Sequence, residues 1–256
     1  SRFDFRMFSL FVVFPSLAAG FTFLTVGDWG GNALQETSKP YHQNVLNVAK
    51  AMDASARAHG AKFVVNTGDN FYWCGVGNTS DFQIKTDWVD PFLSYSSLQV
   101  PWMGVLGNHE YGYNITAQVE MGKYYKNWVM DDRYYTRRVQ LDSSKYATFI
   151  FLDTSACVSS YRSTDPAKWD PCSTMYPTCS LSGGSDQFEG PCRFHENIMA
   201  SDCAPQFTWF QQQLQKTPST DWLIVVGHHG ADEMDIYDFV GAMQKRGFDL
   251  YLNGHE

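Results

Sequence analysis

The sequence has few positive charges and no basic tract. Its 256 residues carry 19 lysines and arginines against 27 aspartates and glutamates, which gives a formal net charge of −8. Proteins that bind nucleic acid neutralise phosphates with clustered lysine and arginine, so this class of function has little electrostatic support. The acidic balance does not exclude a phosphorylated substrate, because bound cations create positive charge locally within an acidic surface.

The sequence also lacks internal repeats, a domain linker and an apolar run long enough to span a membrane comfortably. Its N-terminal apolar stretch, Met7–Phe14, is much shorter than the ~20 residues of a spanning helix. We interpret residues 1–20 as a signal peptide, with Arg2 and Arg6 as the positive flank and Ser16–Gly20 as the cleavage region. A buried N-terminal strand is the alternative. The rest, 44% hydrophobic overall, is long enough for one large domain with a substantial core.

Six cysteines and two glycosylation sequons, at Asn78 and Asn114, fit a secreted chain. Five of the cysteines lie in residues 155–205, a region rich in serine, proline and glycine that we call the insert; the sixth is Cys74. A loop of this length needs a function or a covalent staple. Because five is an odd number, full oxidation requires one insert cysteine to pair with Cys74. The remaining pairings stay open.

Apolar runs predict a core of alternating strands and helices. A helix expected at Gln43–His59 lies between strands Phe21–Val26 and Phe63–Val65, which makes a βαβ unit with parallel strands. Further strands are expected at Trp102–Leu106, Trp222–Val226 and Phe248–Leu252, with a hairpin from Tyr134–Leu141 and Lys145–Leu152. Further helices are expected at Thr116–Val129, around Phe207–Leu214 and around Ile236–Met243, with Asp81–Tyr95 mixed and interrupted at Pro91.

Glycine followed by a possible metal ligand comes after five of these strands. The ligand-type residues are Asp28, Asp69, Asn108, His228 and His255. Ligands bind beyond the carboxyl ends of strands in α/β sheets, so these side chains are expected to meet at one edge and form a mixed oxygen and nitrogen site. The alternative is that Gly-Asp and Gly-Asn are ordinary turn dipeptides, since Gly31-Asn32 and Gly77-Asn78 occur without a preceding strand.

The loop after Phe63–Val65 carries the central residue of this predicted site. Its sequence, Asn-Thr-Gly-Asp-Asn-Phe-Tyr at 66–72, places a carboxylate at Asp69 and a phenol at Tyr72. A carboxylate has two oxygens and can bridge two cations, and a phenolate three residues away can reach one of them as the loop turns. We therefore expect Asp69 to bridge two metals and Tyr72 to bind one of them.

Five motifs together resemble the metallophosphoesterase superfamily. They are GDWG at 27–30, GDNFYWCG at 68–75, GNHE at 107–110, GHH at 227–229 and GHE at 254–256. Within the superfamily the chain resembles the purple acid phosphatases, most closely the small tartrate-resistant type, from about Phe21 to Glu256. Tyr72 distinguishes the purple acid phosphatases from the protein serine/threonine phosphatases of the same superfamily. The latter share the GNHE pattern but have Asp-Arg-Gly where this chain has Phe-Tyr-Trp.

The resemblance implies a dinuclear metal centre. Asp28, Asp69 and Tyr72 are expected to bind Fe(III), and Asp69 bridges to a divalent ion (Fe, Zn or Mn) completed by Asn108, His228 and His255. The family motif runs Gly-His-x-His, and its second histidine, an iron ligand, corresponds to the position directly after Glu256. Two departures affect expected substrate contacts: His229-Gly230 stand where the family usually has Tyr-Pro, and Cys74 replaces an expected small polar residue.

The resemblance also implies a mechanism in which a hydroxide held by the metals attacks phosphorus in line. His109 is our candidate donor of a proton to the leaving group, and His229 is the second candidate, for binding the phosphate or sharing that role. Both histidines could instead orient ligands. Glu110 is expected to accept hydrogen bonds, and Asp153 to be a capping or supporting carboxylate. Cleavage of phosphate monoesters in acid is the expected reaction.

We expect a four-layer α/β/β/α sandwich of two mixed sheets flanked by helices, with the metals at one sheet edge. A secreted or vacuolar acid phosphatase acting as a monomer on small phosphate esters, with no nucleic acid or membrane span, is the predicted protein. One alternative is a phosphodiesterase or nucleotide hydrolase that uses the same metals. Another is a secreted binding protein with a decayed site.

Overall fold

Two four-stranded sheets, each built from short apolar runs of the sequence, form the centre of the protein. The computed structural model describes residues 20–30, 41–175, 179 and 191–255. One sheet has the order β1-β2-β3-β4 and the other the order β5-β6-β7-β8. The strands are β1 (Leu24–Val26), β2 (Val64–Asn66), β3 (Trp102–Gly104), β4 (Trp128–Val129), β5 (Tyr135–Gln140), β6 (Tyr146–Phe151), β7 (Trp222–Val226) and β8 (Leu250–Leu252).

Parallel pairing brings the carboxyl ends of neighbouring strands level with one another. Asn66 is paired with both Val26 and Gly104, and Val226 is paired with Leu252. The loops that follow β1, β2 and β3, and those that follow β7 and β8, therefore start side by side. Only the second sheet is mixed, through the antiparallel hairpin β5–β6. The described strands of the first sheet are all parallel, which corrects the prediction of two mixed sheets.

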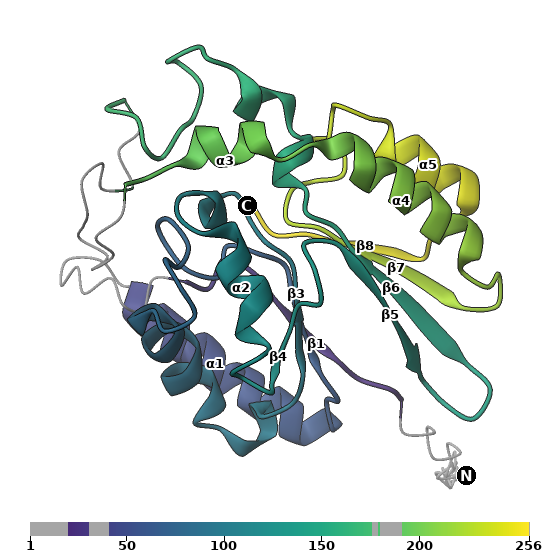
Figure 1. Ribbon diagram of the computed structural model, residues 1–256. Coiled ribbons are helices and arrows are strands. Elements are labelled where there is room, and N and C mark those ends of the chain that lie inside the picture. The colour runs from purple at the N-terminus through teal and green to yellow at the C-terminus, as the bar shows by residue number, and fades with distance from the viewer. Residues whose placement is uncertain (1–19, 31–40, 176–178, 180–190, 256) are drawn as a thin grey trace, which may run out of the picture.

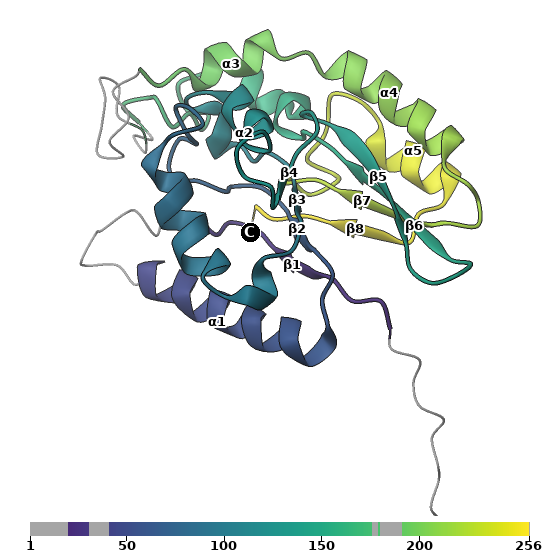
Figure 2. The same cartoon turned by 60° about the horizontal axis from the view of Figure 1, so that its bottom comes forward.

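The two sheets face each other, and helices cover their outer faces, as Figures 1 and 2 show. Helix α1 (Tyr41–His59) lies outside the first sheet, and α4 (Cys203–Lys216) and α5 (Phe239–Arg246) lie outside the second. Aromatic rings fill the space between the sheets, where the ring of Phe149 lies 5.5 Å from that of Phe63. The predicted four-layer sandwich is confirmed.

The helix predicted at Thr116–Val129 is wrong in its second half. Helix α2 covers only Ile115–Met121, and Gly122 follows as its C-cap. The chain then turns and forms β4, in which the ring of Trp128 is buried and its Nε1 donates a hydrogen bond to the carbonyl oxygen of Gln118 at 2.8 Å. Burial of this large ring at the sheet edge prevails over a sequence pattern that continues with helical spacing.

The interruption predicted at Pro91 is also wrong. A ten-residue π-helix, Ile84–Leu93, contains Pro91 in its interior. Proline removes one backbone donor, but Trp88 and Phe92 on the same helix are fully buried. The packing of these two rings keeps the segment helical through the proline. Proline costs a helix about 3 kcal/mol, and burial of each aromatic side chain contributes about 1.5–3 kcal/mol in return.

The insert contains more regular structure than its sequence predicts, including two 3₁₀ turns, at Ser155–Cys157 and Ser159–Arg162, and α3 (Phe194–Ala200). The predicted bond between an insert cysteine and Cys74 is confirmed. The three disulfides are Cys74–Cys179, Cys157–Cys203 and Cys172–Cys192. The first of them joins positions 105 residues apart and holds the insert against the loop that carries Asp69.

Two further sequence predictions concern targeting and modification. The predicted signal peptide, residues 1–20, lies outside the described residues except for Gly20. Asn78 and Asn114 are both exposed, and the Asn114 side chain also caps α2 by accepting a hydrogen bond from the backbone N–H of Thr116. None of the helices in the described ranges combines the length and apolar character that crossing a membrane requires.

Candidate metal centre

Three of the predicted ligands have an unusual backbone conformation. Asp28, Asp69 and His255 have φ angles of 55°, 51° and 68°, and they are the three non-glycine residues with positive φ in the described part of the chain. Side chains rarely adopt this region because Cβ approaches the following carbonyl, and such residues cluster at functional sites. Each follows a glycine at a strand end, so the strand–Gly–ligand pattern corresponds to a sharp backbone turn that directs the ligand into the site.

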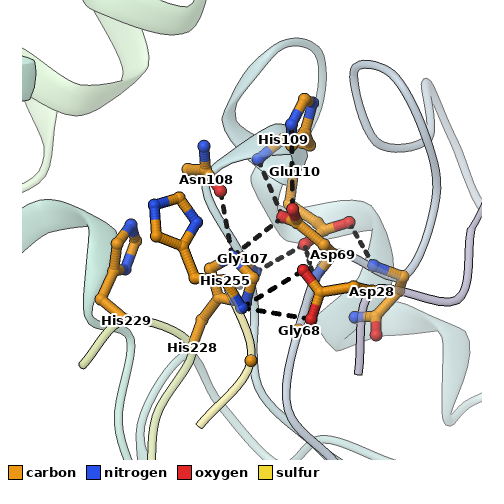
Figure 3. A network of polar contacts seen from close by, with 12 residues as sticks. Asp28, Gly68, Asp69, Gly107, Asn108, His109, Glu110, His228, His229 and His255 are labelled. Atoms are coloured by element: carbon orange, nitrogen blue, oxygen red, sulfur yellow. Dashed lines mark hydrogen bonds and ion pairs between the residues drawn. The ribbon is translucent and has the colours of Figure 1, made fainter. Parts of the chain in front are cut away.

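The carboxylates of Asp28 and Asp69 meet at the hydroxyl of Tyr72. The Tyr72 oxygen lies 3.1 Å from Asp69 Oδ2 and 3.3 Å from Asp28 Oδ1. The backbone N–H of His255 donates to both oxygens of Asp28 at 3.2 Å (Figure 3). Burial and the charge of Asp69 raise the pKa of Asp28. Burial and the charges of Asp69 and Asp28 raise the pKa of the Tyr72 phenol far above its usual range. Added positive charge would relieve this crowding of acidic groups.

Glycines leave room for these carboxylates. A Cβ on Gly107 would lie 2.1 Å from Asp69 Oδ1, and one on Gly254 would lie 2.3 Å from Asp28 Oδ2. Both contacts are far shorter than van der Waals distance, so any side chain at these two positions would push the acidic groups out of place. The glycines before Asn108 and His255 are therefore needed so that the carboxylates of Asp69 and Asp28 can lie close to the backbone at these positions.

The other oxygen of Asp69 faces a second group of predicted ligands. His228 Nε2 lies 3.3 Å from Asp69 Oδ1 and 3.0 Å from Asn108 Oδ1, while Nδ1 lies 2.9 Å from the carbonyl oxygen of Thr67. A carbonyl can only accept, so Nδ1 carries a proton and Nε2 faces the two oxygens. These three atoms need a positive charge between them, which either a metal cation or an imidazolium proton can supply. Although burial lowers the pKa of His228, the charge of Asp69 raises it to about 9.

His109 stands at the rim of the site. Its backbone N–H donates to Asp69 Oδ1 at 3.2 Å, and its Nδ1 lies 2.6 Å from the carbonyl oxygen of Trp73. The carbonyl contact places the proton on Nδ1 and turns Nε2 toward the site, 3.8 Å from Asp69 Oδ2. Although burial opposes it, the imidazoles of His228 and His109 hold the pKa of Asp69 well below its usual range.

His229 is fully buried and has no ring nitrogen available. Its Nδ1 lies 2.7 Å from Thr154 Oγ1, its Nε2 lies 2.9 Å from the hydroxyl of Tyr161, and its ring centroid lies 4.4 Å from that of His255. Burial and the neighbouring His228 and His255 lower the pKa of His229 well below its usual range, so it is a neutral ring. Its ring packs beside that of His255 and does not face Asp69.

All six predicted ligands thus come together, with donor atoms on opposite sides of Asp69. The ligand atoms of Asp28, Asp69 and His228 lie within 4.8 Å of one another, as do those of His228, His229 and His255. A family model for calcineurin-like phosphoesterases matches residues 21–256. The chain belongs to the calcineurin-like phosphoesterase family.

Within this family the chain is similar to purple acid phosphatases, as its motifs predicted. It is 28% identical to tartrate-resistant acid phosphatase type 5 of Sus scrofa over 91% of this chain and 63% of that protein, and 28% identical to the Homo sapiens protein over 96% and 70%. Purple acid phosphatase 7 of Arabidopsis thaliana is 27% identical over 92% of this chain and 63% of its own length. The chain therefore spans about two thirds of these relatives.

A solved structure, "GAP50 the anchor in the inner membrane complex of Plasmodium", shares the fold. It matches with a TM-score of 0.61 and 21% sequence identity, over 91% of this chain and 65% of that chain. At this identity the likeness extends to the arrangement of sheets and helices only.

Glu110 supports the centre of this phosphoesterase fold in the way the sequence predicts. Its buried carboxylate accepts hydrogen bonds from four backbone N–H groups, of Asp69, Asn70, Phe71 and Gly107, at distances of 2.6–3.2 Å. One side chain therefore ties the loop after β2 to the loop after β3. Burial and the charge of Asp69 raise the pKa of Glu110 to about 7. Asp153 is also a supporting group, because its carboxylate binds Tyr111 and Arg133 outside the centre.

Sequence reasoning missed Thr154, Tyr161 and Trp169. Thr154 lies three residues after the end of β6, where a polar residue close to a strand end could have indicated a role. Tyr161 and Trp169 lie in the insert, which has no periodicity, and only the fold brings Trp169 to within 5.2 Å of His109, measured between ring centroids. No signal in the sequence marks these two aromatic residues.

Proposed function

We propose that this member of the phosphoesterase family is a metal-dependent acid phosphatase that hydrolyses phosphate monoesters. One observation carries the proposal: the two oxygens of Asp69 face two different donor groups. Oδ2 faces Tyr72, beside Asp28, and Oδ1 faces His228, beside Asn108. This is the arrangement that a carboxylate bridging two cations requires.

The donor chemistry fits the metals that the resemblance implies. Asp28, Asp69 and Tyr72 offer hard anionic oxygens, which suit Fe(III), and a highly charged cation would also favour the phenolate that the acidic neighbours disfavour. Asn108, His228 and His255 would hold a divalent ion, Fe, Zn or Mn, with the second oxygen of Asp69. When bound, such a pair activates water and neutralises charge on the phosphoryl group.

The chain's own residues would complete the reaction. His109 has its Nδ1 proton committed to the Trp73 carbonyl, so an imidazolium at this position would release its other proton from Nε2, the atom that faces the site. We propose that this proton goes to the leaving oxygen of the substrate. Because both nitrogens of His229 already have partners, we assign His229 a positioning role rather than contact with substrate.

The three disulfides support a protein made in the secretory pathway, which we propose to be secreted or vacuolar. The acid pH optimum is proposed from the similarity to acid phosphatases. Small phosphate monoesters are the proposed substrates. The side chains at the rim of the site would determine which ester is preferred.

The purified protein tests this proposal directly. We expect about two metal ions per chain by elemental analysis, and faster release of nitrophenol from para-nitrophenyl phosphate than from its bis ester at acid pH. Faster cleavage of the bis ester would favour the phosphodiesterase alternative. A protein that takes up no metal and cleaves neither ester would contradict the proposal and favour a binding protein.

Tyr72→Phe tests the assignment of iron. If Tyr72 binds Fe(III) as a phenolate, the iron-loaded protein has a charge-transfer band in the visible spectrum, and the substitution is expected to abolish it. The phenylalanine keeps the ring contact of Tyr72 with His109, whose centroids lie 4.7 Å apart, so the fold should be retained. Visible spectra of the iron-loaded proteins measure the effect. An unchanged band in the variant would show that another residue supplies the colour.

A further inference from the structure

The insert contributes two aromatic rings to one side of the proposed centre. The ring of Trp169 lies 5.2 Å from that of His109 and 5.7 Å from that of Tyr161, and Tyr161 lies 5.4 Å from His229. His229 in turn lies 4.4 Å from His255. These contacts form a continuous row of rings from the proposed proton donor to a proposed ligand. Trp169 and Tyr161 also line a cavity of about 300 Å³ whose lining residues all lie in the insert.

The hydrogen bonds of Thr154 determine which nitrogen of His229 carries a proton. Thr154 Oγ1 accepts from the backbone N–H groups of His228, at 3.3 Å, and His229, at 3.1 Å. A hydroxyl oxygen has two lone pairs, so both are used, and the hydroxyl proton is left for His229 Nδ1 at 2.7 Å. His229 Nδ1 is therefore an acceptor, and an imidazole whose Nδ1 accepts a hydrogen bond carries its proton on Nε2.

With this tautomer, the hydroxyl proton of Tyr161 has no acceptor among the residues that the structure describes. His229 Nε2–H donates to the Tyr161 oxygen at 2.9 Å, and among the described residues this is the hydrogen bond found for that hydroxyl. Tyr161 is 8% exposed. Burial, followed by the charges of Asp69 and Glu233, raises the pKa of Tyr161, so the group stays a neutral donor near the acidic centre. A buried hydroxyl proton needs an acceptor.

We propose that Tyr161 donates this proton in a hydrogen bond to a phosphoryl oxygen of the substrate, and that His229 and Thr154 fix its direction. The inference rests on the proposed function and adds to it a substrate contact supplied by the insert. The ligand class is a tetrahedral oxyanion, phosphate or a phosphate ester. A hydrogen bond to such an anion is a charge-assisted bond, about twice as strong as one between neutral groups.

Tyr161→Phe in the metal-loaded protein tests the proposal. Calorimetric titration with inorganic phosphate is expected to show about ten- to a hundredfold weaker binding, the loss typical of one hydrogen bond to a charged group. The metal content should be unchanged, since Tyr161 is outside the proposed ligand set. In turnover assays we expect KM for para-nitrophenyl phosphate to rise at least as strongly as kcat falls.

Tyr251→Phe is the matched control. The Tyr251 hydroxyl donates to the backbone carbonyl of His229 at 2.8 Å, so it supports the same histidine while its proton is already used. Phosphate affinity in this variant should stay within about twofold of the wild type, with melting temperatures recorded for both variants. Equal losses in the two variants would reduce Tyr161 to a support for His229 and overturn the proposal. Wild-type affinity in Tyr161→Phe would also overturn it, and leave the proposed function intact. A wild-type protein that binds no phosphate would overturn both.

Discussion

Asp69→Asn is expected to empty both metal positions and to lower phosphatase activity by on the order of a thousandfold or more. The substitution keeps the size of the side chain but removes the charge and one of two acceptor oxygens. Because Oδ1 and Oδ2 face different donor groups, neither position keeps its bridging ligand. Loss of a single electrostatic contact to a transition state already costs about 10²–10³ in rate. Elemental analysis and turnover of para-nitrophenyl phosphate measure the two effects.

Asp131→Asn is the matched control for this variant. Asp131 is an exposed carboxylate paired with Arg137 on the surface, and its removal should leave metal content and turnover unchanged. Two metals per chain in Asp69→Asn would rule out bridging by Asp69. One retained metal would instead identify which of the two donor groups holds its cation without the carboxylate.

Glu110→Ala is expected to lower the free energy of unfolding by about 5 kcal/mol. It leaves four buried backbone N–H groups without their acceptor, and each such group costs about 1–3 kcal/mol unless water reaches it. For a chain of this size the loss corresponds to a fall in melting temperature of about 10–20 °C. The loops after β2 and β3 also lose their shared anchor, so metal affinity should fall as well. Thermal unfolding with and without metal measures both effects.

Glu120→Ala provides the comparison. Glu120 is exposed on α2 and pairs with Lys123 one turn away, so its loss should change the free energy of unfolding by less than about 0.5 kcal/mol. If Glu110→Ala melted like Glu120→Ala, water would have to replace the carboxylate at all four donors, and Glu110 would not be the anchor of the two loops.

The parts of the fold that could be predicted from sequence are those in which a strand is buried on both faces. The sequence predicts the strand Trp222–Val226 with the bounds it has, because an uninterrupted apolar run indicates a strand between layers, and Leu223–Val226 are buried there. The end of α2 was missed because residues after Gly122 keep helical spacing while Trp128 gains more from burial at the sheet edge. The local sequence pattern carries no information about this competition between helical spacing and burial of a distant ring.

The candidate centre was predictable for a different reason. A predicted ligand shortly after a strand needs no knowledge of distant packing, since parallel strands in level register bring their ends together. The structure does bring the side chains of Asp28, Asp69 and His228 together. Tyr161 reaches the same place by another route. It lies in an insert whose position depends on disulfides and aromatic packing, and no rule of spacing connects it to His229, 68 residues later.

The left-handed backbone at Asp28, Asp69 and His255 has a consequence for engineering. Holding a non-glycine residue in this conformation costs a fold about 1–3 kcal/mol. A library selected for heat resistance alone would therefore be drawn toward glycine at these three positions and would discard the proposed ligands as it gained thermal tolerance. Directed evolution of this scaffold toward the proposed activity needs a screen for catalysis in every round, because substitutions at these three positions that raise stability would remove the proposed metal ligands.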